Sequence, residues 1–344
     1  MLFLYFPAIE KVAYPKTILL GNNNFYRFGM NLEKRIIKSK INAIAEGSQL
    51  DDYLAKRFTY HSLEKWRKLI VDGQILLNDE ACQASSILHN NDILVYMPEN
   101  LEEPPVDFDY SIVYEDKDLF VINKTGDLPC HPSGPFFKHS LWHHLSSRYG
   151  KVYLINRLDR ETSGLLIAAR SPQVTSLFAK IQQKKLKKEY RVLVFGNFKK
   201  PIIADGYLIK DTKSIVRKKQ SFISAGKQAP DTPESMKVTT IFEAIWANDN
   251  FSLVKAILKT GRLHQIRASL FSLGFPVVGD KLYGPDDNIY LKIRDNKITD
   301  EDWNKLAMPR QALHSYRLSF IHPLSLEKMA FTAPLTRDFL NQSS

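Results

Sequence analysis

Residues 156–164 read Asn-Arg-Leu-Asp-Arg-Glu-Thr-Ser-Gly, and this polar stretch separates two apolar runs, residues 152–155 and 165–169. Apolar runs of this length predict buried strands, so we expect the polar stretch to be a loop that the core holds on both sides. Asp159 lies in this loop between two arginines, and neighbouring guanidinium groups favour an ionised carboxylate. The stretch therefore predicts a charged aspartate at a well-defined position.

The loop ends in Thr162, Ser163 and Gly164. Short hydroxyl side chains bond to nearby backbone and glycine adopts positive φ without strain, so these residues suit a tight turn close to a ligand. They also fit a plainer interpretation, in which Asp159 forms salt bridges in a surface turn and has no chemical role. The choice between the two depends on the rest of the sequence.

Four blocks of the sequence, taken in order, resemble the RluA-type pseudouridine synthase family. The catalytic loop of that family reads His-Arg-Leu-Asp-x-x-Thr-Ser-Gly, and residues 156–164 match it except that Asn156 replaces the leading His. The other blocks are residues 119–124 (Leu-Phe-Val-Ile-Asn-Lys) followed by His131-Pro132, then Lys188-Glu189-Tyr190, and residues 260–267 (Thr-Gly-Arg-Leu-His-Gln-Ile-Arg). The resemblance covers roughly residues 110–334.

The resemblance implies an α+β protein. We expect a pseudouridine synthase fold with a mostly antiparallel mixed sheet and a central cleft, together with a small N-terminal α/β RNA-binding domain. The expected boundaries are an irregular basic arm (1–47), the RNA-binding domain (48–97), a linker rich in proline and acidic residues (98–109), the catalytic domain (110–337) and a tail (338–344).

The N-terminal domain is predicted to contain two short helices and a hairpin. Apolar residues recur at helical spacing over residues 50–58, Ser62 is a suitable N-cap for a second helix, and residues 75–77 and 93–96 read as strands. This order resembles the αL RNA-binding domain of a ribosomal small-subunit protein. Its candidate RNA-binding face comprises Lys56, Arg57, Lys65, Arg67 and Lys68. Any surface helix carries charge, so these residues also fit ordinary solvated positions.

The composition favours a polyanionic partner. Lys and Arg number 48 against 37 Asp and Glu, a formal net charge of +11, which attracts nucleic acid through the release of counterions. The two cysteines, Cys82 and Cys130, are far apart and form no zinc or disulfide pattern, so we expect a reduced, cytoplasmic setting. No apolar run reaches the length of a membrane span. The expected partner is structured RNA, ribosomal or transfer, bound by a monomer.

Several cofactor motifs are absent from the sequence. It contains no Gly-x-x-x-x-Gly-Lys phosphate loop, no dinucleotide fingerprint and no His-Glu-x-x-His. We therefore expect neither a cofactor nor a metal. The isomerisation of uridine to pseudouridine fits this expectation, because one carboxylate can start it by attacking the anomeric carbon or by removing a proton from the 2′ carbon.

The resemblance also implies roles for individual residues. Asp159 matches the catalytic aspartate, Arg267 the arginine that pairs with it, and Tyr190 the aromatic residue that stacks on the target base and is proposed to accept a proton later. Arg157 matches the residue that fills the space vacated by the flipped nucleotide. The full set of expected substrate-binding residues is Arg157, Arg160, Thr162, Ser163, Gly164, Lys188, Arg262, His264, Gln265 and, on the wall of the cleft, His131.

Three local predictions concern the surroundings of these residues. A helix with Pro172 in its first turn is expected to end in a lysine-rich stretch, residues 180–188, and residues 199–227 are expected to be irregular. A second helix over residues 262–273 would bring His264 and Arg267 onto one face near its start, where anions bind favourably.

Two other functions remain open. A hydrolytic RNA or nucleoside glycosidase would also use a carboxylate at the anomeric carbon, but it needs a second carboxyl group to activate water, and Glu161 is the only acid nearby in the sequence. A non-catalytic RNA-binding or ribosome-assembly protein would keep the basic surfaces. It would have no need of Asp159, Tyr190 and Arg267 together. The presence of all three favours the enzyme, and large-subunit ribosomal RNA is the favoured substrate.

Overall fold

The computed structural model describes residues 37–58, 61–98, 103–182, 185–216, 219–226, 235–295 and 297–341. The chain divides into two compact units, residues 1–100 and 101–344. Most of the arm predicted over residues 1–47 lies outside the described residues. Among the helices of the described ranges, none is both long enough and apolar enough to cross a membrane.

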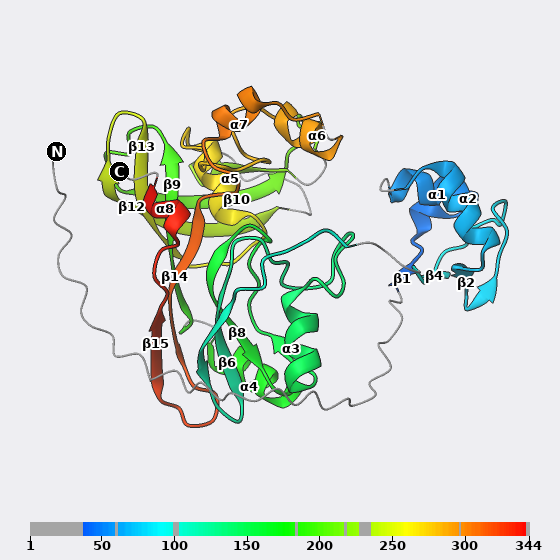
Figure 1. Ribbon diagram of the computed structural model, residues 1–344, viewed down its shortest axis with the longest axis horizontal. Coiled ribbons are helices and arrows are strands. Elements are labelled where there is room, and N and C mark those ends of the chain that lie inside the picture. The colour runs from blue at the N-terminus through cyan, green and yellow to red at the C-terminus, as the bar shows by residue number, and fades with distance from the viewer. Residues whose placement is uncertain are drawn as a thin grey trace. The chain divides into compact units, whose positions relative to one another are not determined.

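The first unit contains a four-stranded antiparallel sheet and two α-helices (Figure 1). Its elements are β1 (Ile37–Lys40), the 3-10 turn η1 (Ala43–Ala45), α1 (Leu50–Arg57), α2 (Leu63–Val71), β2 (Ile75–Leu77), β3 (Glu80–Ala81) and β4 (Ile93–Tyr96), with the strand order β1-β4-β2-β3. Trp66 is fully buried in its core beside Leu50 and Leu54. The predicted helices and strands of this unit are confirmed, and the Ser62 hydroxyl caps α2 by accepting the N–H of Lys65.

Acidic neighbours pair with part of the candidate RNA-binding face. The pairs are Lys56–Asp52, Arg67–Asp51 and Lys68–Asp72, with N–O distances of 3.5, 2.8 and 3.4 Å. The Lys56 and Lys68 pairs join exposed side chains and contribute only about 0–1 kcal/mol, so an RNA phosphate can replace the acid there. Asp51 is buried, so Arg67 is held more firmly. RNA contact by this face stays a prediction.

The second unit is built on an eleven-stranded sheet. Its elements are β5 (Ser111–Glu115), β6 (Leu119–Lys124), α3 (Leu141–Tyr149), β7 (Tyr153–Leu154), β8 (Ser163–Ala169), α4 (Pro172–Gln182), β9 (Lys187–Phe195), β10 (Ile202–Lys210), β11 (Gln220–Ser224), β12 (Met236–Ala247), β13 (Phe251–Leu258), α5 (Gln265–Ser272), α6 (Asn288–Arg294), α7 (Asp300–Leu306), β14 (Leu313–Ile321), β15 (Lys328–Thr332) and α8 (Arg337–Asn341).

The strands of this sheet run in the order β11-β10-β12-β13-β9-β14-β8-β6-β5, with β15 beside β14 and β7 beside β8. Among the described residues, neighbouring strands of this sheet pair antiparallel except β14 and β8, which pair parallel. Figure 1 shows α5, α6 and α7 at one end of the unit and α3 and α4 at the other. The predicted α+β class with a mostly antiparallel mixed sheet is confirmed.

Gly164 allows β8 and β14 to approach each other closely. Its φ is +102°, and a Cβ atom there would lie 2.3 Å from the backbone oxygen of Ser315. Because of this contact, β8 begins at Ser163, two residues earlier than its apolar run. The end of the polar loop is therefore anchored directly in the sheet.

We expect Gly164→Ala to lower the free energy of unfolding by about 3 kcal/mol or more, because the side chain adds both backbone strain and a clash with rigid backbone. Chemical denaturation measures this change. Gly150→Ala is the matched control, since Gly150 also has positive φ (+77°) but has open space where the Cβ would lie. An equal loss of stability in both variants would contradict the role given to the β8–β14 contact.

Two local predictions are wrong. Helix α4 ends at Gln182, and Lys187 and Lys188 begin strand β9, so the lysine-rich stretch is not one helical end. Residues 199–227 are not an irregular excursion, because they contain β10 and β11. In both places lysines at the ends of strands obscure the alternation of buried and exposed positions that marks a strand.

The predicted linker is also shorter than expected, because residues 103–109 belong to the second unit. The Glu103 carboxylate accepts the backbone N–H groups of Phe137, Lys138 and His139 at 2.7, 2.8 and 2.7 Å. Burial would raise the pKa of Glu103, but these three bonds outweigh it and hold the pKa below its usual value. The charged carboxylate thus fastens the start of the unit to the loop that precedes α3.

Candidate active site

Hydrogen bonds hold the loop that carries Asp159 on both sides of this residue. On one side, the Leu158 N–H donates to the Cys130 sulfur at 3.3 Å. On the other, the buried Lys124 ammonium donates to the backbone oxygens of Thr125 at 2.6 Å and Arg160 at 2.9 Å. Burial lowers the pKa of Lys124 to about 8, whereas the two carbonyl oxygens and the charge of Asp159 favour its protonated form. The backbone of Asp159 is therefore fixed before any substrate arrives.

Arg267 joins the Asp159 carboxylate to a second, fully buried carboxylate. Its Nη1 donates to Asp159 Oδ2 at 2.7 Å, while Nε and Nη2 donate to the two oxygens of Asp280 at 2.6 and 2.8 Å. Asp280 also accepts the backbone N–H groups of Leu282 and Tyr283, both at 2.9 Å. The bidentate contact fixes the guanidinium plane, so Arg267 approaches Asp159 from one direction only.

These contacts keep Asp159 ionised. Burial alone would raise the pKa of its carboxyl group, but the charges of Arg267 and His264 and the hydrogen bonds from Arg267 and Gln311 outweigh burial and lower the pKa below its usual value. The same pairing raises the pKa of Arg267 despite burial and lowers that of Asp280. At neutral pH the Asp159–Arg267–Asp280 group therefore carries one net negative charge.

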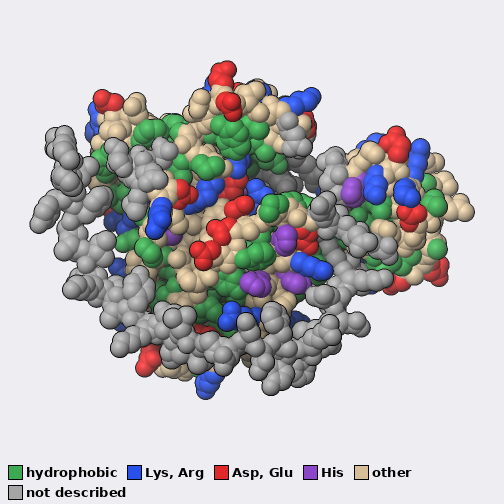
Figure 2. All heavy atoms as spheres, viewed as in Figure 1, with side chains coloured by type: hydrophobic (Ala, Val, Ile, Leu, Met, Phe, Trp, Pro, Cys, Tyr) green, Lys and Arg blue, Asp and Glu red, His purple; other side chains and the backbone are tan. Residues whose placement is uncertain are grey.

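A pocket opens above Asp159. It is lined by Arg157, Leu158, Asp159, Thr162, Tyr190, Leu258, Arg262, His264, Gln265, Ile266, Arg267 and Leu313. Tyr190 is 6% exposed and comes from β9, so its ring forms part of the pocket wall. Burial raises the pKa of Tyr190 to about 12, with a contribution from the Asp159 charge, so its hydroxyl is neutral at pH 7. Figure 2 shows acidic and basic side chains gathered near the middle of the visible face of this unit.

The structure brings most of the predicted site residues to this pocket. Besides Asp159, Tyr190 and Arg267, the predicted residues that line it are Arg157, Thr162, Arg262, His264 and Gln265. Lys188 lies at its edge, close over Gly261, where a Cβ atom would come 3.1 Å from the Lys188 nitrogen. Burial lowers the pKa of Lys188.

The remaining predicted residues lie outside the pocket lining. The Arg160 guanidinium is paired with Asp127 and Glu161 at 3.3 and 3.4 Å. His131 lies against the Trp142 ring of α3, with ring centres 6.5 Å apart. Ser163 is fully buried and bonds to His314 Nδ1 at 2.8 Å. Substrate contact by these residues and by Gly164 is untested, and Ser163 and Gly164 have a visible role in the sheet.

The start of α5 differs from the prediction. The helix begins at Gln265, not at Arg262, and His264 precedes it in the left-handed conformation (φ 54°, ψ 16°). His264 and Arg267 both reach the pocket, but they do so from a turn and a helix and not from one helical face. The Gln265 amide holds the turn by accepting from the Thr260 hydroxyl and the Arg262 N–H at 2.9 and 3.0 Å.

Asn156, which replaces the family's usual histidine, has a structural contact. It is buried, and its Oδ1 accepts the N–H of Ile167 in β8 at 2.8 Å. Its Nδ2 has no hydrogen-bond partner among the described residues. Asn156 therefore supports the loop from outside the pocket lining, and a ring nitrogen of histidine could accept the same N–H.

We expect Asn156→His to keep turnover within about threefold of the wild type, since the acceptor is preserved. Asn156→Leu should lower the free energy of unfolding by about 1–3 kcal/mol, because the buried Ile167 N–H loses its partner. Single-turnover kinetics and thermal unfolding of both variants measure these effects. A large fall in turnover for Asn156→His, with normal stability, would show that the amide has a chemical role.

Sequence reasoning missed three residues of this site. Asp280 is absent from the predicted site residues, although a lone aspartate between apolar residues beside Gly279 was a usable signal for a buried acid. Lys124 lies at the end of an apolar run, a position where the sequence pattern predicts an exposed cation. Gln311, whose side-chain Nε2 lies 3.4 Å from Asp159 Oδ2, gave no signal, because 152 positions separate the two in sequence.

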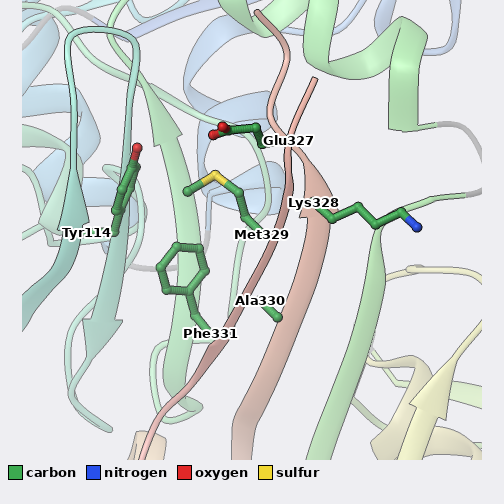
Figure 3. A pocket seen from close by; sticks show the side chains of 6 residues that line it. All are labelled: Tyr114, Glu327, Lys328, Met329, Ala330 and Phe331. Atoms are coloured by element: carbon green, nitrogen blue, oxygen red, sulfur yellow. The ribbon is translucent and has the colours of Figure 1, made fainter. Parts of the chain in front are cut away.

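A second concavity lies between β5 and the start of β15. Figure 3 shows Met329 and Phe331 pointing toward Tyr114, whereas Lys328 points the other way. The nearby group Asp116, Asp118 and His322 has the spacing of metal ligands. However, His322 Nδ1 accepts the N–H groups of Leu324 and Ser325 at 3.3 and 3.1 Å, which places its proton on the nitrogen facing Asp116. That nitrogen has no lone pair for a metal.

Comparisons with known proteins agree with this geometry. A family model described as RNA pseudouridylate synthase matches residues 118–272. Ribosomal large subunit pseudouridine synthase D of Buchnera aphidicola is 31% identical over 326 residues, covering 88% of this chain and 97% of that protein. An uncharacterised RNA pseudouridine synthase, YjbO of Bacillus subtilis, is 32% identical over 280 residues, covering 77% and 88%.

A solved structure shows the same fold. Human RNA Pseudouridylate Synthase Domain Containing 4 aligns with a TM-score of 0.51 and 22% identity over 67% of this chain and 90% of that one. The fold and the similar proteins together define an isomerase that acts on RNA. The chain belongs to the RNA pseudouridylate synthase family and is of the RluA type.

Proposed function

We propose that this protein converts specific uridines of structured RNA to pseudouridine, that its substrate is large-subunit ribosomal RNA, and that Asp159 is its catalytic residue. The observation that carries the proposal is the contact of Arg267 with Asp159 at the base of the pocket. Relatives named ribosomal large subunit pseudouridine synthase D support the choice of RNA. Transfer RNA is the alternative substrate. A monomeric state and a cytoplasmic location stay predictions.

The reaction needs one bond broken and one formed at the same sugar carbon. The bond from the anomeric carbon to the base nitrogen breaks, the base turns, and its C5 bonds to the same carbon. The proton on C5 is lost and the released nitrogen gains one, so no atom is added overall. An ionised Asp159 can start this sequence by attacking the anomeric carbon or by removing the 2′ proton.

The other pocket residues are given supporting roles. Arg267 keeps the carboxylate charged and aimed. Tyr190 offers a ring face for the base, and because its hydroxyl is neutral we assign it contact and hydrogen bonding in preference to action as a phenolate base. Arg157 is exposed at the mouth of the pocket, where it can fill the space of an everted nucleotide.

Cations at the edge of the pocket fit a nucleic-acid strand. Arg157 and Arg262 are exposed and line the pocket, and the Lys188 ammonium lies close to Gly261, the residue before Arg262. The buried Asp159–Arg267–Asp280 group is negative, so the phosphates are expected to bind at this basic edge and the neutral uracil and sugar to enter the centre.

A glycosidase is less well supported, because it needs a second carboxylate free to activate water. Glu161 does not line the pocket, and it is bonded to the Lys281 ammonium and to the backbone N–H of Gln311. Asp280 is fully buried and committed to Arg267. Neither acid is placed to activate a water above Asp159.

Separate incubation of the purified protein with large-subunit ribosomal RNA and with transfer RNA, followed by chemical mapping of pseudouridine, tests this proposal. We expect modification at a few discrete sites of the ribosomal RNA and none with Asp159→Asn. Modification of transfer RNA alone would overturn the choice of substrate. Release of free uracil would favour the glycosidase, and tight binding without modification would favour a non-catalytic RNA-binding protein.

A further inference from the structure

Gln311 lies two residues before the start of β14 and is 2% exposed. The segment it belongs to is tied to the catalytic loop by backbone contacts: its own N–H donates to Glu161 Oε2 at 3.2 Å, and the neighbouring Arg310 Nη1 donates to the Glu161 backbone oxygen at 3.1 Å. The Gln311 side chain is therefore held at a fixed place beneath the loop.

The two N–H groups of the Gln311 amide reach different acceptors. Nε2 lies 2.5 Å from Thr162 Oγ1 and 3.4 Å from Asp159 Oδ2. Thr162 is itself fixed, because its backbone N–H donates to the backbone oxygen of Asp159 at 3.1 Å. Gln311 thus bridges the residue that begins the turn and the residue that ends it.

The two oxygens of Asp159 differ in their surroundings. Oδ2 accepts from both Arg267 Nη1 and Gln311 Nε2, whereas Oδ1 accepts no hydrogen bond from the described residues. Two donors on one oxygen, approaching from α5 and from the segment before β14, resist rotation about the Cβ–Cγ bond. The position of Oδ1 is therefore fixed as well, and its lone pairs stay available.

We propose that Gln311 is a positioning residue that, with Arg267, fixes the rotation of the Asp159 carboxylate so that Oδ1 is the oxygen that reacts with the sugar. This inference rests on the proposed role of Asp159 as the catalytic residue. Gln311 acts through Asp159 and touches no substrate. A neutral amide suits this position, because it donates to the carboxylate without adding a second cation that would tie up both oxygens.

The test uses two variants of similar shape. Gln311→Met removes both donors, and Gln311→Glu replaces a donor with a carboxylate facing Asp159. We expect single-turnover rates to fall about tenfold for Gln311→Met and further for Gln311→Glu, with little change in KM, as for the loss of one hydrogen bond to a charged group. Gln220→Met, at a half-buried glutamine outside the pocket lining, is the matched control and should retain wild-type kinetics.

The pH profile separates positioning from a merely structural role. The Gln311 hydrogen bond lowers the pKa of Asp159, so its loss should raise that pKa and move the acid limb of the rate profile to higher pH. The limb should move further for Gln311→Glu. Thermal unfolding reports whether each variant is folded at the temperature of assay, and either folded variant suffices for the test.

Two results would overturn the proposal. One is a folded variant with wild-type rate and an unshifted acid limb. The other is a rate that falls equally at every pH in proportion to lost stability, which a structural role predicts. Failure of the catalytic assignment is a separate result, since it would appear as activity in Asp159→Asn whatever the Gln311 variants do.

Discussion

Asp159→Asn should form pseudouridine about 10⁴-fold or more slowly than the wild type, because the amide has nearly the same shape but can neither attack the anomeric carbon nor accept the 2′ proton. The loss should appear in the single-turnover rate and not in RNA affinity. Removing a negative charge from the pocket should leave binding of the polyanion unchanged or slightly tighter. Parallel measurement of the rate and of RNA binding by filter retention or fluorescence distinguishes these effects.

Asp127→Asn is the matched control for this variant. Asp127 lies near the same loop, where it pairs with Arg160 at 3.3 Å, but it does not line the pocket. We expect its rate to stay close to that of the wild type. If the rate of Asp159→Asn lies within tenfold of the wild-type rate, Asp159 is not the catalytic residue.

Arg267→Lys should lower the single-turnover rate by about 10²-fold. An ammonium keeps the charge but cannot donate to Asp280 with two N–H groups while also reaching Asp159, so the carboxylate loses its orientation. Arg267 lowers the pKa of Asp159, and a weaker contact raises it, so the acid limb should move to higher pH. The buried Asp280 also loses its bidentate partner, which should lower the free energy of unfolding by about 3 kcal/mol.

Arg170→Lys is the matched control for Arg267→Lys, because Arg170 has a structural role outside the pocket. Arg170 donates to the Asp116 backbone oxygen at 2.8 Å and lies 4.0 Å over the Phe120 ring, with no contact to the pocket lining. We expect reduced stability with a normal rate and pH profile. A wild-type acid limb in Arg267→Lys would contradict the claim that this guanidinium holds Asp159 ionised.

The parts of the fold that the sequence predicted well are those with strong local patterns. Ser62 caps the first turn of α2, and Pro172 begins α4, as the sequence predicted. Such signals come from residues within one turn of each other. Such signals are weaker between residues 180 and 227, where lysines obscure β10, β11 and the start of β9, and the pairing of these strands depends on distant partners.

The candidate site likewise contains residues that the sequence predicted and residues that only the structure revealed. Asp159, Tyr190 and Arg267 were found because they lie in blocks that resemble a known family, and they line one pocket although they come from a loop, a strand and a helix. Asp280 contacts Arg267, which is 13 positions away in the sequence, and Gln311 contacts Asp159, which is 152 positions away. The sequence carries a local signal for Asp280 but none for Gln311, and the burial and contacts of both residues reveal their roles.

The structure of Asp159→Asn bound to a fragment of its substrate RNA would test the central claim most directly. We expect a uridine turned out of the strand, with its base against Tyr190 and its anomeric carbon next to the side-chain oxygen of residue 159. Arg267 should still be paired with Asp280. A target nucleotide whose sugar lies away from residue 159, or one that remains stacked in the strand, would contradict the account.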